Sequence, residues 1–282
     1  MDSSLIAALT GEKVVDATGV GGGCIADARR VTLASGRVVF VKQAAGLPDD
    51  AFEAEAAGLR ALAACPELRI PQVVAVDPKA LVLEWVETAR PGPGFMERFG
   101  RAFAELHRIT GDAFGFDRDN YLGRTPQPNL ERNDNWATFF FEHRIAYQLR
   151  LAERNGHADA ALRQAVSDLE LRIDGLLAGS EEPPTLLHGD LWGGNFLADE
   201  QQRPVLIDPA AYYGHREADL AMTRLFGGFS SGFYAAYEEA FPLPDGEQRR
   251  RPLYEAWHLL NHLNLFGRSY YAQSLSALRA CC

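Results

Sequence analysis

Three polar residues near position 200 of this 282-residue chain have the types and spacing that phosphoryl transfer requires. Asn195 follows Asp190 by five residues, and Asp208 follows it by 18, directly after the apolar pair Leu206-Ile207. Phosphoryl transfer needs a carboxylate beside the acceptor hydroxyl, and an amide oxygen and a second carboxylate to hold Mg²⁺ against the phosphates. The pattern predicts Asp190 as the catalytic base and Asn195 and Asp208 as Mg²⁺ ligands.

The segment from His188 to Asn195 has the H-x-D-L-x-x-x-N layout of a kinase catalytic loop. The alternative is a hairpin whose Asp and Asn only cap turns, but the full pattern with a downstream Asp is uncommon there. Gly189 stands where protein kinases carry an Arg, and no A-P-E segment follows Asp208. Without that Arg a phosphorylated activation loop has no receiver, so we expect a constitutively assembled site for small molecules or small adducts.

A lysine in the first part of the chain is expected to neutralise the phosphates. Lys42 ends the apolar run 38–41, the setting of the strand lysine in the V-A-I-K motif. On a strand its side chain shares a face with Phe40, which places the ammonium at the roof of a cleft. A solvated lysine at a strand end is the alternative.

The next helix offers two acidic partners for Lys42, and its apolar face separates them. Phe52 and Leu59 mark that face, and Glu55 lies between them at helical spacing. Glu53 lies about 200° from Glu55 around the helix. We therefore predict a Lys42–Glu55 ion pair and a solvated Glu53.

The remaining nucleotide contacts are predicted from loops. Gly21, Gly22 and Gly23 join the first two expected strands, where backbone N–H groups can approach a phosphate. Cys24 follows them and is a redox candidate, because such N–H groups and Lys42 favour a thiolate; a small packed side chain is the alternative. Glu84 and Val86 end the last strand of this region, where an adenine is expected to meet backbone groups.

Two further residues have open roles. Asp219 is either an acid in the first turn of a helix or a buried carboxylate that anchors the catalytic loop backbone from below. Trp192, inside the catalytic loop, either contacts the acceptor or packs in the core.

The elements that position these residues suggest an α+β fold with two lobes. Residues 1–89 are expected to form a small antiparallel β lobe with one main helix, and residues 90–282 a larger, mostly helical lobe that carries the catalytic loop and the acceptor site. The Gly and Pro residues at 91–94 mark the linker. Expected strands cover 13–20, 26–33, 37–43, 72–76 and 80–86. Expected helices cover 49–64, 95–109, 135–154, 158–177, 217–226 and 247 onward.

Composition narrows the class of protein. The chain is 47% hydrophobic and 23% charged, with a net charge of −10, which argues against nucleic acid as partner. No apolar run approaches the roughly 18 residues of a membrane span, and the acidic N-terminus is unlike a signal peptide. Four cysteines in neither a disulfide nor a zinc pattern suggest a reducing cytoplasm. We expect a cytoplasmic monomer or weak dimer.

A more specific pattern covers nearly the whole chain, at residues 21–25, 40–42, 52–59, 121–129, 187–195, 208–210, 213–221 and 225–229. Together these runs resemble one family, the fructosamine/ketosamine-3-kinases, which are relatives of the aminoglycoside and choline kinases with a protein-kinase-like fold.

The resemblance implies ATP- and Mg²⁺-dependent phosphorylation of O3 on the sugar of a ketoamine, the adduct of a reducing sugar with an amine. A phosphate at C3 can be expelled once the neighbouring carbonyl enolises toward C1, which frees the amine. The acceptor would be a small-molecule or protein-bound ribulosamine or fructosamine, and Trp192 and His215 are its tentative contacts.

Two other functions compete with this one. A kinase of the aminoglycoside or choline type would keep every catalytic residue and differ only in its acceptor pocket, around residues 120–129, Trp192 and 212–215. A pseudokinase scaffold would lack the Lys, Asp or Asn, and none is missing.

Overall fold

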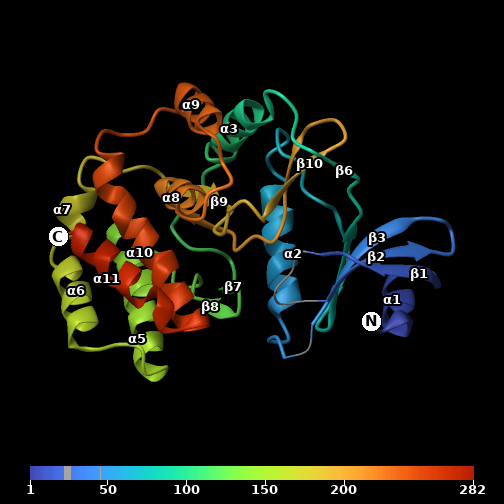
Figure 1. The fold of residues 1–282 in the computed structure, drawn as a ribbon, viewed down its shortest axis with the longest axis horizontal. Helices are drawn as coiled ribbons and strands as arrows, with labels where there is room; N and C mark the ends of the chain where they lie inside the picture. The colour runs from blue at the N-terminus through green and yellow to red at the C-terminus, as the bar shows by residue number, and fades with distance from the viewer. Residues whose placement is uncertain (22–26, 45) are drawn as a thin grey trace.

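The computed structural model describes residues 1–21, 27–44 and 46–282 and is shown in Figure 1. Its first part is an antiparallel sheet with the strand order β1-β2-β3-β5-β4. The five strands are β1 (Val14–Gly19), β2 (Asp27–Leu33), β3 (Val38–Gln43), β4 (Val73–Asp77) and β5 (Ala80–Glu84). Each was predicted to within two residues at either end.

Two helices cover opposite faces of this sheet. Val39 and Val41 of β3 belong to an apolar cluster with Ile6 of α1 (Ser3–Thr10), a helix that the sequence analysis did not predict. Phe40 packs instead on the face that contains Phe52, from α2 (Ala51–Leu62). The alternation along β3 therefore directs Lys42, two residues after Phe40, toward the α2 side, as predicted.

The second part is mostly helical (Figure 1). Its helices are α3 (Phe95–Leu106), α4 (Trp136–Phe140), α5 (Tyr147–Arg154), α6 (Ala160–Glu170), α7 (Ile173–Leu177), α8 (Glu217–Leu225), α9 (Ser231–Ala240), α10 (Glu247–Phe266) and α11 (Tyr271–Ala280), with a 3₁₀ turn η2 (Arg268–Tyr270). A π-helical segment η1 (Phe141–Ala146) lies between α4 and α5, so the predicted helix 135–154 is continuous but irregular. The predicted helix 158–177 is instead broken between α6 and α7, and α9 was not predicted.

Short antiparallel strand pairs flank the catalytic segment. β10 (Phe196–Asp199) pairs with β11 (Pro204–Leu206), and β9 (Thr185–Leu187) pairs with β12 (Tyr212–Gly214). A further hairpin joins β7 (Asn120–Leu122) and β8 (Thr125–Gln127).

The predicted boundary at residue 89 carries a contact across it. β6 (Thr88–Ala89) pairs with β10 of the helical part, with Ala89 opposite Ala198. Arg69 adds two ion pairs at the same junction, to Glu84 (2.7 Å) and to Asp199 (3.0 Å). The division into domains 1–89 and 90–282 stays a prediction. Within the described residues, no helix is both long and apolar enough to cross a bilayer.

Candidate active site

A cavity of ≈ 230 Å³ lies where α2 and β3 face the catalytic segment. Six of the predicted site residues line it: Lys42, Glu55, Asp190, Trp192, Asn195 and Asp208. The other walls come from the loop before α2 and from the β7–β8 hairpin, and include Leu47, Pro48, Ala51, Asn120 and Tyr121. Residues up to 166 positions apart in sequence thus meet at one site.

The roof of the cavity holds the predicted ion pair. The Nζ of Lys42 lies 2.7 Å from Oε1 of Glu55 and also donates to Oδ1 of Asp208. Burial would lower the pKa of Lys42, but the carboxylates of Glu55 and Asp208 outweigh it and raise that pKa above its ordinary value. Glu53 instead pairs with Arg60, 2.9 Å away on the exposed side of α2, so the helical-face prediction is confirmed.

Under the cavity, the catalytic loop is fixed by His188. Its Nδ1 accepts from the backbone N–H of Asp190 (3.2 Å), so its Nε2 carries the proton and donates to the carbonyl of Ile207 (2.9 Å). Burial lowers the pKa of His188, which keeps the imidazole neutral. One side chain therefore ties Asp190, the predicted base, to the segment that bears Asp208.

Asp219 anchors the same loop from below, the second of its two predicted roles. Its carboxylate accepts from the backbone N–H of His188 (2.7 Å) and of Gly189 (2.8 Å), and lies 3.3 Å from Nε2 of His107. Burial alone would raise the pKa of Asp219, but the hydrogen bonds from His107 and Gly189 outweigh it and hold the pKa below its usual value.

Gly189 is required by the shape of this loop. Its φ is +82°, and a Cβ there would lie 2.1 Å from the carbonyl oxygen of Ala210. An Arg of the protein-kinase type cannot occupy the position without moving the segment after Asp208.

Asp190 lies half-buried at the cavity floor. Burial, followed by the charges of Asp208 and Asp219, raises the pKa of the Asp190 carboxyl well above its ordinary value. Nδ2 of Asn195 donates to the backbone carbonyl of Asp190 (2.8 Å), and this bond fixes the orientation of the amide. A carboxylate with a raised pKa is a stronger base than a solvated one.

Asn195 and Asp208 fit the Mg²⁺ ion that a kinase requires. Nδ2 of Asn195 is occupied by its bonds to Asp190, which orients the amide. Its Oδ1 has no hydrogen-bond partner among the described residues. Asp208 supplies a carboxylate from a backbone with φ of +56°, a strained conformation of the kind found at functional sites. Oxygen ligands, few in number and completed by phosphates, suit Mg²⁺. No group of three or more His, Cys, Asp or Glu that could hold a metal occurs in the described ranges.

The predicted nucleotide contacts outside the cavity differ in their support. Gly21 is exposed at the end of the described N-terminal range, whereas Gly22, Gly23 and Cys24 lie outside the described residues. Glu84 and Val86 do not line the cavity. The carboxylate of Glu84 binds Arg69 and the N–H of Gln72, so a nucleotide contact there would use the backbone. All of these contacts stay predictions.

Trp192 has the exposure expected of an acceptor contact. It lines the cavity and is 40% exposed. Its indole ring lies over Gly194, where a Cβ would come within 2.4 Å of the ring. Because Gly194 has no side chain, it leaves room for the indole of Trp192 at the cavity wall.

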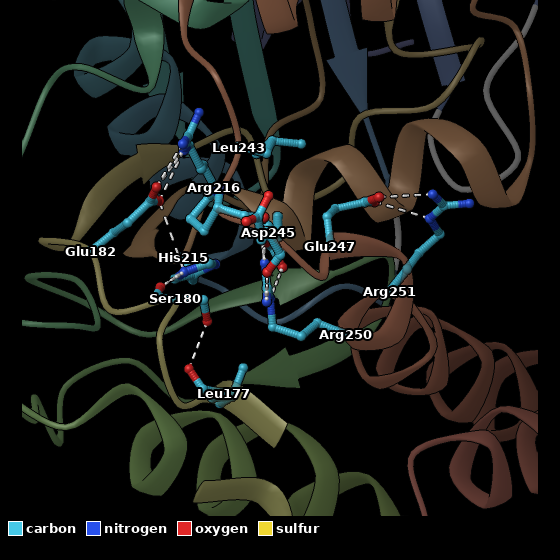
Figure 2. A network of polar contacts seen from close by, with 12 residues as sticks. Leu177, Ser180, Glu182, His215, Arg216, Leu243, Asp245, Glu247, Arg250 and Arg251 are labelled. Carbon is cyan, nitrogen blue, oxygen red and sulfur yellow. Dashed lines mark hydrogen bonds and ion pairs between the residues drawn. The ribbon is translucent and has the colours of Figure 1, made fainter. Parts of the chain in front are cut away.

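His215 lies away from the cavity that six of the predicted site residues line. It is 1% exposed and is absent from the lining of the cavity. Its Nε2 donates to the carbonyl of Ser180 (2.6 Å) within the polar network of Glu182 and Arg216 in Figure 2, and its Nδ1 accepts from Tyr254. Tertiary packing thus holds this imidazole in a polar network, and its role as an acceptor contact stays a prediction.

His107 is a supporting residue that the sequence analysis missed. It is fully buried, and its Nδ1 lies 2.7 Å from the hydroxyl of Tyr237. Phe99 and Phe103 mark the buried face of α3, and His107 falls four residues after Phe103 on the same face. A histidine in that register was the available signal for a buried polar contact.

Comparisons with known proteins agree with the resemblance. The fructosamine kinase family model matches residues 2–282. The chain is 41% identical over 277 residues to a candidate ketoamine kinase of Synechocystis, covering 95% of this chain and 91% of that protein. It is 38% identical over 266 residues to the chloroplastic protein-ribulosamine 3-kinase of Arabidopsis thaliana, covering 92% and 80%.

Solved structures give the same result. A candidate fructosamine-3-kinase from Thermobifida fusca has a TM-score of 0.90 at 37% identity, covering 99% of this chain and 98% of that one. More distant structures include an aminoglycoside phosphotransferase and a choline kinase, at TM-scores of 0.65 and 0.66 and identities of 14% and 18%, which show a shared fold alone. The predicted kinase-like α+β fold is confirmed, and this chain belongs to the fructosamine kinase family.

Proposed function

We propose that this protein is a ketosamine-3-kinase, which transfers a phosphoryl group from ATP to the 3-hydroxyl of a ribulosamine or fructosamine. The observation that carries the proposal is the meeting of Lys42, Glu55, Asp190, Asn195 and Asp208 around one cavity, in a chain of this family. The relatives are named for ketoamine and protein-ribulosamine substrates.

Asp190 acts as the general base. The proton of the acceptor hydroxyl moves to its carboxylate while the acceptor oxygen bonds to the γ-phosphorus and the bond from that phosphorus to the β-phosphate oxygen breaks. His188 and Asp219 hold the loop so that the carboxylate keeps its place. The carboxylate is oriented before any acceptor arrives.

Lys42 provides positive charge for the phosphates, and Glu55 holds it at the cavity roof. In the structure the ammonium also binds Asp208. Asn195 and Asp208 would hold Mg²⁺, which when bound neutralises charge that develops on the phosphates.

The position of the transferred phosphate explains how the amine is released. A phosphate on C3 lies β to the carbon next to the amine, so enolisation of the neighbouring carbonyl toward C1 breaks the C3–O bond and expels the phosphate. The imine left at C1 is then hydrolysed by water, which breaks the C–N bond and releases the free amine and a deoxydicarbonyl sugar. The protein would in this way remove sugars from glycated amines, either small or attached to a polypeptide. Trp192 is the side chain proposed to contact the acceptor at the exposed wall of the cavity.

An acceptor panel tests this function. ATP consumption is measured with ribulose- and fructose-modified lysine derivatives, with an aminoglycoside and with choline, at equal concentrations. We expect turnover with a ketoamine and none above background with the other two. Turnover of the aminoglycoside or choline without any ketoamine activity would assign the protein to a different class of small-molecule kinase.

A further inference from the structure

Tyr121 and Asp50 join the two parts of the molecule beside the cavity. Tyr121 lies on β7 of the helical part, and Asp50 immediately precedes α2 of the sheet part. The hydroxyl of Tyr121 donates to Oδ1 of Asp50 at 2.5 Å, across 71 positions of sequence. Burial and the nearby Asp50 carboxylate raise the pKa of Tyr121 to about 12, so the hydroxyl remains a donor.

Asp50 forgoes its ordinary local role to make this contact. It occupies the N-cap position of α2, where an Asp normally accepts from the N–H groups of the first turn, yet its side chain makes no such bond. Asp2, Asn135 and Asp159, at the same position of α1, α4 and α6, all accept these bonds. The carboxylate of Asp50 is directed to the other part of the molecule instead.

Arg118 supports the same contact. Its Nη2 lies 3.8 Å from Oδ2 of Asp50, and its Nη1 lies 3.9 Å from Oε1 of Glu53. Two carboxylates at the start of α2 therefore face a hydroxyl and a guanidinium from the segment that includes β7. The hydrogen bond of Tyr121 is the short-range contact in this group.

Both sides of the contact lead to the catalytic residues. On one side, Asp50 is followed five residues later by Glu55, which holds Lys42. On the other, Asn120 beside Tyr121 donates to the carbonyl of Ala211 (2.7 Å), and Gln127 of the same hairpin donates to the carbonyl of Ala210 (3.1 Å). Ala210 and Ala211 lie two and three residues after Asp208.

We propose that the Tyr121–Asp50 hydrogen bond is an interlobe latch that positions the Lys42–Glu55 pair against Asp190 and Asp208, and that Tyr121 and Asp50 are positioning residues for the kinase reaction. The latch joins Tyr121 to the residue that precedes Ala51, and both Tyr121 and Ala51 line the cavity. Its effect on catalysis rests on the proposed function; its effect on the two segments does not.

Hydrogen exchange tests the latch without any acceptor. Tyr121→Phe removes only the hydroxyl, and Asp49→Asn removes a neighbouring exposed carboxylate as the matched control. We expect faster exchange at the amides of 51–55 and of 120–127 in Tyr121→Phe, and wild-type exchange in Asp49→Asn. Unchanged exchange in both segments of Tyr121→Phe overturns the latch, whether or not any ketoamine is phosphorylated.

A double-mutant cycle then separates positioning from general stability. With a ketoamine acceptor, Tyr121→Phe and Asp50→Ala are each expected to lower kcat about tenfold, while the double variant is no slower than the slower single variant. KM for the acceptor and the melting temperature should change little. Losses in kcat that multiply in the double variant, or that follow the melting temperature, contradict a shared positioning role.

Discussion

Below the catalytic loop, Asp219 is 1% exposed and accepts two backbone N–H groups, whereas above it the side chains of Lys42 and Asp208 meet with 12% and 42% of their surfaces exposed. Asp219, His107 and His188 form the lower group, and their side chains are hydrogen-bonded to other parts of the protein. Lys42, Glu55 and Asp208 form the upper group, whose charged side chains are paired with one another where we propose that nucleotide and Mg²⁺ bind. The comparison indicates that the lower residues fix geometry while the upper ones are available for ligands, so substitutions in the two groups should separate stability from turnover.

The largest expected effect on turnover is that of Asp190→Asn, at the boundary between the two groups. The amide keeps the shape of the side chain but cannot accept the acceptor proton, so kcat should fall by ~10²–10⁴. The melting temperature and the affinity for nucleotide are expected to stay near wild type. Kinetics and thermal unfolding of the same preparation check this, and wild-type turnover would remove Asp190 from its role.

Asp219→Ala, in contrast, should lower the stability of the fold strongly. It leaves the N–H groups of His188 and Gly189 and the imidazole of His107 without their partner. Three orphaned buried donors cost roughly 3 kcal/mol or more of unfolding free energy. Urea unfolding measures the loss, with Asp174→Ala on α7 as a control. A variant as stable as wild type would show that Asp219 does not anchor the loop.

In the upper group, Glu55→Ala and Glu53→Ala form a matched pair on one helix. Glu55→Ala frees Lys42 from the roof of the cavity and should lower kcat/KM by about 10- to 100-fold, a range consistent with a misplaced charged group. Glu53→Ala should change it less than about threefold, because an exposed ion pair contributes little. A reversal of the two results would contradict the helical-face argument.

The smallest expected effect is a pH dependence of stability from buried histidines. Burial lowers the pKa of His258 to about 3, and its ring nitrogens have no partner among the described residues. Unfolded histidine titrates near about 6.5, so below this pH the unfolded state takes up a proton that the folded state refuses. The free energy of unfolding should therefore fall as the pH drops from about 6.5 toward 3, with His107 and His188 acting in the same direction.

Urea unfolding between pH 7.5 and 5 measures this slope. In His258→Leu the loss of unfolding free energy across that interval should be smaller than in wild type. An identical slope in the two proteins would mean that His258 is not the neutral, buried group described here.

Much of the site was predictable because its signals are local. The spacing from Asp190 to Asn195 and Asp208 is fixed within one segment, and the choice of Glu55 over Glu53 needed only helical periodicity. The buried position of His215 was not predictable, because its partners, Ser180 and Tyr254, lie 35 and 39 residues away and no local pattern marks them.

The fold also divides into elements that local sequence patterns predict and elements that depend on long-range packing. The five strands of the sheet and α2 follow from apolar alternation and turn residues, which act over a few positions. α1 and α9 were missed, and the break between α6 and α7 was not foreseen, because packing decides where such short helices begin and end. The Tyr121–Asp50 contact joins residues 71 positions apart, and nothing in either segment alone predicts it.

The most direct test of the central claim is to identify the product. A ribulose- or fructose-modified lysine derivative is incubated with ATP, Mg²⁺ and either wild type or Asp190→Asn, and followed by mass spectrometry and phosphorus–proton correlation spectroscopy. Wild type should add one phosphoryl group at O3, after which the phosphate is lost and free lysine derivative appears, while Asp190→Asn should give almost none of this product. Phosphorylation at another hydroxyl, or equal product from the two proteins, would contradict the account.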